Sequence, residues 1–159
     1  MTRFCSLPSF LTSATLLGLS WLPSAHAELP GQTTFKSVCV ACHGAAGQGV
    51  PGLAPALADA LNAHLAGGDQ AKTYFASVLA AGLSGPIESK GQKFNSAMPN
   101  LGLQDAQIAE VLNYVLLDLN HAPNSMALTE ADVARARASG PTPAKTHAMR
   151  KALLAATGK

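Results

Sequence analysis

Three reactive side chains lie within five residues of this chain, Cys39, Cys42 and His43, in the run Cys-Val-Ala-Cys-His. Two cysteines three positions apart and a following histidine form the C-x-x-C-H pattern of covalent haem attachment. Each thiol adds to one vinyl group of the porphyrin, and a short helical turn places both sulfurs along one edge of the ring. The imidazole of His43 then stands where it can bind the iron from one face. The pattern predicts one covalent haem c, with His43 as an axial ligand.

Other uses of a cysteine pair fit this sequence less well. A thioredoxin-like pair follows a β-strand in a βαβ unit, and no β-branched run precedes Cys39. A structural zinc site takes four ligands, usually from two clusters, and the sequence has no second C-x-x-C or H-x-x-x-H. A disulfide between Cys39 and Cys42 would close a very small loop and stabilise little. Haem attachment is therefore favoured.

The first 27 residues have the pattern of a secretory signal. Arg3 supplies a charged start, residues 10–22 are mostly apolar, and Ala25-His26-Ala27 is a small-x-small cleavage site. The apolar run is short for a membrane span, so an uncleaved anchor is the weaker alternative. We expect residues 1–27 to be removed after Ala27. The product would then lie in the periplasm and not be an integral membrane protein.

Length and charge limit the remaining function classes. The chain has 159 residues and a formal net charge of +2, with 13% charged residues. A near-balanced charge is not the footprint of a nucleic-acid-binding protein. The sequence has no Ser–His–Asp set, carboxylate pair or phosphate loop beside the haem motif, so we assign no catalytic residues.

Helical periodicity favours an all-α fold. Residues 31–41 form a predicted helix in which Phe35 and Cys39 share one side. Residues 59–82 and 105–119 are also expected to be helical, and the second of these segments has a wide apolar face. Tyr74 is expected in the core, with hydrogen bonding to a haem propionate as the alternative. His64 is expected at the surface or at a helix cap.

Two loops supply further candidate haem contacts. Residues 44–57 are rich in glycine and proline and end near Pro55, and Met98 precedes a proline between a glycine-rich loop and an amphipathic helix. Methionine sulfur is a soft ligand that suits low-spin iron and raises its reduction potential. A lone methionine is more often core filler, but this position would let the loop cross the second haem face.

From about residue 31 to residue 119, the chain resembles bacterial class I c-type cytochromes in the order of these motifs. The resemblance implies the cytochrome c fold, in which the N- and C-terminal helices cross beside one covalently bound haem. It implies that Gly31 and Phe35 meet Val111 and Tyr114 at this crossing. It also implies that the carbonyl of Pro55 accepts the His43 Nδ1–H, with Pro51 as a competitor, and that Met98 is the sixth iron ligand.

The domain prediction is a signal peptide at 1–27, a cytochrome c domain at 28–119 and a helical extension at 120–159. Within the extension, Thr129 is expected to cap a short helix to about Ser139. A second helical segment at 145–156 is short, so we expect it to be mobile until a partner orders it, or simply frayed. The helix that ends at Leu119 already supplies the crossing partner for residues 31–35, so we expect no contribution of the extension to haem binding.

The predicted function is periplasmic electron transfer through one haem with His43 and Met98 as axial ligands, without enzymatic activity of its own. The protein would serve as a carrier, or as the electron-accepting subunit of a periplasmic dehydrogenase, reductase or oxidase. Lys36, Lys90 and Lys93 are candidates for partner docking. The alternative is a peroxidase-like haem enzyme or a sensor, which requires a sixth ligand that dissociates.

Overall fold

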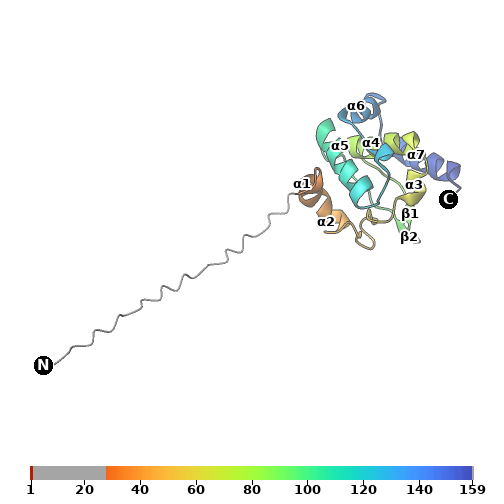
Figure 1. Cartoon of the computed structure of the whole chain (residues 1–159). Helices are drawn as coiled ribbons and strands as arrows, with labels where there is room; N and C mark the ends of the chain where they lie inside the picture. Colours follow the sequence, from red (N-terminus) through yellow and green to blue (C-terminus); the bar gives the residue numbers. More distant parts are fainter. Residues whose placement is uncertain (2–27, 159) are drawn as a thin grey trace.

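The computed structural model describes Met1 and residues 28–158, so the predicted signal peptide lies outside the described residues apart from Met1. The described chain folds as a helical unit with one small hairpin (Figure 1). The helical elements are α1 (Gln32–Thr34), η1 (Phe35–Cys39), α2 (Val40–His43), α3 (Asn62–Leu65), α4 (Asp69–Ala81), α5 (Asp105–Asn113), η2 (Tyr114–Asp118), η3 (Asn124–Met126), α6 (Glu130–Ala138) and α7 (Pro143–Ala156). Strands β1 (Ile87–Ser89) and β2 (Gln92–Phe94) pair antiparallel.

The N-terminal helix crosses α5 and η2 at Gly31 and Phe35, as Figure 1 shows for α1 and α5. Gly31 has a φ of 79°, and a Cβ built there would lie 2.1 Å from the Glu110 carbonyl oxygen. Only glycine permits this approach of the two backbones. One turn later, the rings of Phe35 and Tyr114 meet edge to face with centroids 5.3 Å apart. The predicted crossing is confirmed, and it fixes the helix that carries the two cysteines.

We predict that Gly31→Ala lowers the free energy of unfolding by roughly 2–4 kcal/mol, because it adds both backbone strain and a clash with α5. Gly52→Ala is the matched control, since Gly52 has a similar φ of 74° and no atom within 4 Å of a built Cβ. The control should lose only about 1–2 kcal/mol, the cost of the left-handed backbone. Thermal or denaturant unfolding of the holoproteins measures both values. Equal losses would show that the crossing is not tightly packed.

The segment predicted as helix at 59–82 is divided. α3 and α4 are separated by residues 66–68, where Gly67 and Gly68 interrupt the chain, and residues 59–61 precede α3 in a turn. A glycine pair marks a turn or loop, so the expectation of one continuous helix was wrong, and the Gly67-Gly68 pair is the reason. The segment between α4 and Met98, expected to be a loop, contains the β1–β2 hairpin.

Asn120 is a buried residue that connects η2 to the loop before α3. Its side-chain oxygen accepts hydrogen bonds from the backbone N–H groups of Ala60 and Leu61 at 3.1 and 3.0 Å. Its amide donates to the carbonyl oxygens of Leu57 and Val115, each at 2.7 Å. One amide side chain thus satisfies backbone groups on two elements, which ties the end of the 44–57 loop to the core.

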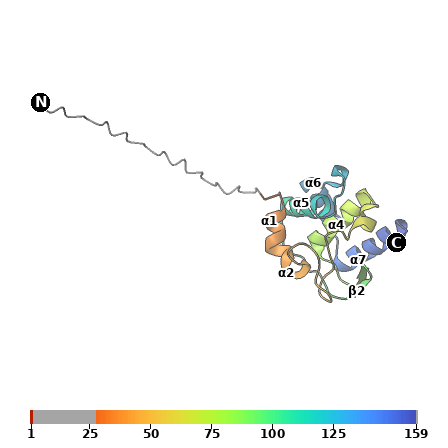
Figure 2. The same cartoon turned by 60° about the horizontal axis from the view of Figure 1, so that its bottom comes forward.

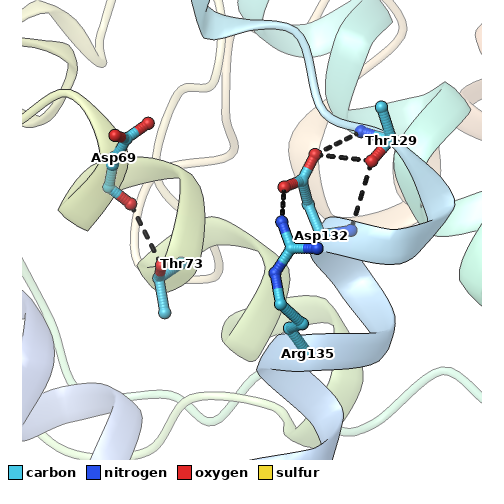
Figure 3. Close-up of polar contacts among 5 residues, drawn as sticks. All are labelled: Asp69, Thr73, Thr129, Asp132 and Arg135. Carbon is cyan, nitrogen blue, oxygen red and sulfur yellow. Dashed lines mark hydrogen bonds and ion pairs between the residues drawn. The ribbon is translucent and has the colours of Figure 1, made fainter.

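The first helix of the C-terminal extension begins as predicted. The Thr129 hydroxyl accepts from the Asp132 N–H at 3.3 Å, and the Asp132 carboxylate accepts from the Thr129 N–H at 2.7 Å (Figure 3). These reciprocal bonds form a capping box at the start of α6. Arg137 near its other end donates to the Asp105 carboxylate at 2.8 Å. This ion pair joins α6 to the start of α5, beside which α6 lies.

The second helix of the extension is not a frayed or mobile tail. α7 lies against α4 and beside the hairpin, as the two views agree (Figures 1 and 2). Thr146 is fully buried, and its hydroxyl donates to the Gly82 carbonyl oxygen at 2.7 Å. Leu153 is also buried, and His147 Nε2 lies 2.8 Å from the Pro86 carbonyl oxygen. The expectation of a segment ordered only by a partner was wrong, because its buried face belongs to the core.

Within residues 28–158, no helix combines the length and the apolar character needed to cross a membrane.

Candidate functional site

A cavity of about 230 Å³ lies between the cysteine-bearing helix, α4, α5, the hairpin and α7. Its walls are mostly apolar and include Phe75, Val78, Leu112 and Val115. All of the residues predicted to contact a haem line this one cavity: Cys39, Cys42, His43, Pro55 and Met98. A buried apolar chamber with a few polar groups is the usual form of a cofactor site. The donor set of two thiols, an imidazole and a thioether fits a covalently attached haem.

His43 is held in a fixed orientation at the wall of the cavity. Its Nδ1–H donates to the Pro55 carbonyl oxygen across 2.8 Å, which leaves Nε2 as the nitrogen available to a metal. Gly49 makes this geometry possible, because a Cβ built there would lie 2.8 Å from the Pro55 carbonyl carbon. Burial lowers the pKa of His43, and the bond to Pro55 partly opposes this. The imidazole is therefore neutral at pH 7, the form that binds iron.

Cys39 and Cys42 are free thiols three positions apart, at the junction of a π-helical turn and α2. Cys39 ends a π-helical turn and is buried, whereas Cys42 lies in α2 and is exposed. Burial, and then the neighbouring Cys42, raise the pKa of Cys39 to about 11. Single π-turns in helices are frequently found at functional sites. Here the turn ends at the first cysteine, so it contributes to the placing of both sulfurs along the cavity.

Met98 lies at the wall of the same cavity on an extended loop. Its backbone pairs with Leu83, and the two N–H···O distances are both 2.9 Å. Leu83 directly follows the glycine whose carbonyl accepts from Thr146 of α7. The methionine loop is therefore supported by the end of α4 and, one step further, by the C-terminal extension. Met126 is buried in the hydrophobic core and does not line the cavity.

His64, Tyr74 and Arg150 also line the cavity. Of these three, only Tyr74 had been considered from the sequence, as the alternative to a core residue. His64 is buried, which corrects the expectation of a surface or capping residue. Its ring stacks on Tyr74 at 5.8 Å, with planes 9° apart. Arg150 comes from α7, so the expectation that the extension has no place at the cavity was wrong. The residues on either side of His64, in the run Asn-Ala-His-Leu at 62–65, form no pattern that indicates this burial.

Comparison with known proteins agrees with this architecture. The family model for cytochrome c matches residues 29–117. Two curated relatives from Thermus thermophilus, each called cytochrome c-552, are 36% identical to the chain over 119 residues. The matches cover 72% of this chain and 90% or 80% of the two relatives. The cavity, the crossing helices and these similarities lead to one conclusion: the chain belongs to the cytochrome c family of haem c electron-transfer proteins.

Proposed function

We propose that this protein transfers electrons in the periplasm through one haem c that is attached to Cys39 and Cys42 and ligated by His43 and Met98. The observation that carries the proposal is the His43–Pro55 hydrogen bond at 2.8 Å, which leaves Nε2 free in a cavity that Met98 also lines. A histidine held through its other ring nitrogen is the usual arrangement of a ligating imidazole. The thioether of Met98 then completes a six-coordinate iron.

Bound haem supplies the one-electron ferrous–ferric couple, and the polypeptide adjusts it. The carbonyl of Pro55 orients His43 and increases its basicity, while Met98 favours the ferrous state relative to a second histidine. The apolar side chains around the cavity keep water from the ring. Leu83 fixes the backbone on each side of Met98, so the thioether needs little rearrangement when the iron changes oxidation state.

The hairpin supports a partner surface at the edge of the cavity. Ile87 and Phe94 line the cavity, and Lys90 and Lys93 are exposed on the same hairpin. Lysines at a rim mainly increase the association rate with acidic partners. Lys36 is a weaker candidate, because its Nζ pairs with the Glu28 carboxylate at 2.5 Å. We propose that the partner is a periplasmic redox protein. The present protein would reach it either as a diffusing carrier or as a bound subunit of a dehydrogenase, reductase or oxidase.

The visible spectrum of the purified protein tests the ligation. We expect the ferric form to show the weak long-wavelength band of methionine-ligated haem, and the ferrous form to bind carbon monoxide slowly or not at all. A peroxidase-like enzyme or a sensor with an open iron site is the alternative. Rapid carbon monoxide binding to the native ferrous protein, without the methionine band, would favour that alternative and contradict the closed electron-transfer site.

A further inference from the structure

Arg150 is a buried cation without an acidic partner. The residue is 8% exposed, and one guanidinium nitrogen donates to the Glu88 carbonyl oxygen at 2.6 Å. Within residues 28–158, the ion pairs join Lys36 to Glu28, Arg135 to Asp132 and Arg137 to Asp105, and none includes Arg150. Buried charges in proteins are normally paired, because an isolated charge loses its hydration without compensation. A bound anion would therefore stabilise the buried guanidinium of Arg150.

Arg150 lines the cavity, where an anion bound inside could reach it, and two hydrogen-bonding rings accompany it there. Arg150, His64 and Tyr74 come from three helices, α7, α3 and α4, and all three residues line the cavity. His64 and Tyr74 are 7% and 5% exposed. The Nδ1 atom of His64 is buried and has no hydrogen-bond partner among the described residues. The hairpin contributes a backbone carbonyl, through Glu88, to this group. A cation thus lies beside two hydrogen-bonding rings in the wall of a mostly apolar cavity.

We propose that Arg150, together with Tyr74 and His64, forms the binding subsite for a haem propionate, so that α7 completes the haem pocket from outside the matched family domain. The inference rests on the proposed covalent haem, whose carboxylates are the anions that such a cavity would receive. A guanidinium is well suited to this role, because its planar set of donors matches a carboxylate in two parallel hydrogen bonds.

The two rings supply hydrogen bonds rather than charge. Burial, and secondly the charge of Arg150, lower the pKa of His64 to about 4. Burial raises the pKa of Tyr74 to about 12, which Arg150 partly opposes. Both rings are therefore neutral at pH 7, and Arg150 provides the positive charge of the subsite. Tyr74 thereby has a place at the cavity as well as in the core.

Replacing Arg150 by glutamine should change the redox properties in two ways. Loss of a nearby positive charge stabilises the ferric state, so the reduction potential falls. Loss of the partner also raises the pKa of the propionate, because a buried carboxylate without a cation favours its neutral form. The potential then declines with rising pH across that pKa, whereas the wild-type potential stays flatter. Removing Arg150 also raises the pKa of His64, because the charge of Arg150 contributes to lowering it. Infrared bands of the carboxyl group are therefore needed to distinguish titration of the propionate from titration of the imidazole.

The experiment is a potentiometric titration of the holoproteins from about pH 5 to pH 8, with carboxyl bands followed by infrared difference spectroscopy. Lys151→Gln is the matched control, because it removes the same charge from an exposed neighbour on α7. Arg150→Lys should restore most of the potential. Arg150→Met, which keeps the apolar stem, serves as a second charge-free variant if Arg150→Gln does not fold.

The visible spectrum separates this inference from the proposed function. Wild-type protein without covalent haem, or without the methionine band, would contradict the proposed function. With haem and methionine ligation intact, a potential and pH dependence in Arg150→Gln and Arg150→Met that match those of Lys151→Gln would overturn the propionate subsite. A lowered and newly pH-dependent potential in the charge-free variants alone would support it.

Discussion

Met98→Leu should convert the closed haem site into one that binds external ligands. The substitution removes the sulfur but nearly conserves side-chain volume, so the fold should lose less than about 1.5 kcal/mol. The ferric methionine band should disappear, the reduction potential should fall, and imidazole should bind at least roughly tenfold more tightly, which corresponds to about 1.4 kcal/mol. Spectrophotometric titration with imidazole measures this change.

Met126→Leu is the control for that experiment. Met126 is 5% exposed in the core and lies away from the cavity, so its replacement should leave the spectrum and the imidazole affinity unchanged. Survival of the methionine band in Met98→Leu would show that another side chain binds the iron. The sixth ligand would then be a methionine other than Met98.

The double variant Cys39→Ala, Cys42→Ala should lose covalent haem completely. Peroxidase staining of a denaturing gel should fall to background, since each thioether needs its own thiol. The apoprotein should also be poorly stable. An empty apolar cavity of 230 Å³ costs about 5.5 kcal/mol at roughly 24 cal/mol per Å³. That is comparable to the whole stability of a small domain, so circular dichroism should show a lower melting temperature and reduced helix content.

The single variants provide the comparison. Cys39→Ala and Cys42→Ala each retain one thiol beside His43, so each should keep some haem through one thioether bond. A stained band in the double variant would place the covalent attachment elsewhere. Loss of staining in both single variants would instead mean that both bonds are needed for attachment to occur.

The features that could be predicted from the sequence are local ones. The cysteine–histidine motif occupies five residues, and Thr129 and Asp132 identify the start of α6 because a capping box spans a single turn. The apolar face of 105–119 similarly follows from helical periodicity. The hairpin could not be predicted because its strands have three residues each, too few to show an alternating pattern. The break between α3 and α4 could be predicted from Gly67 and Gly68, because a glycine pair outweighs the helical spacing of the apolar residues around it.

The unpredicted part of the site depends on contacts between distant segments. Arg150 reaches a carbonyl 62 positions earlier in the chain, and Thr146 reaches one 64 positions earlier. Neither contact leaves a pattern in the residues around it. A basic residue on a short helix is equally compatible with a solvated surface, so only the packing of α7 against α4 distinguishes the two. The burial of His64 has the same origin, because α7 covers it.

The hydrogen bond from Thr146 to Gly82 belongs to a wall of the cavity that is separable from the rest in the chain. The cysteines lie near the start of the described residues, whereas α7, which lines the cavity and supports the methionine loop through Gly82, lies at their other end. A cut before Pro143 would therefore remove one wall and the support of the methionine loop, and would leave Cys39, Cys42 and His43 in place.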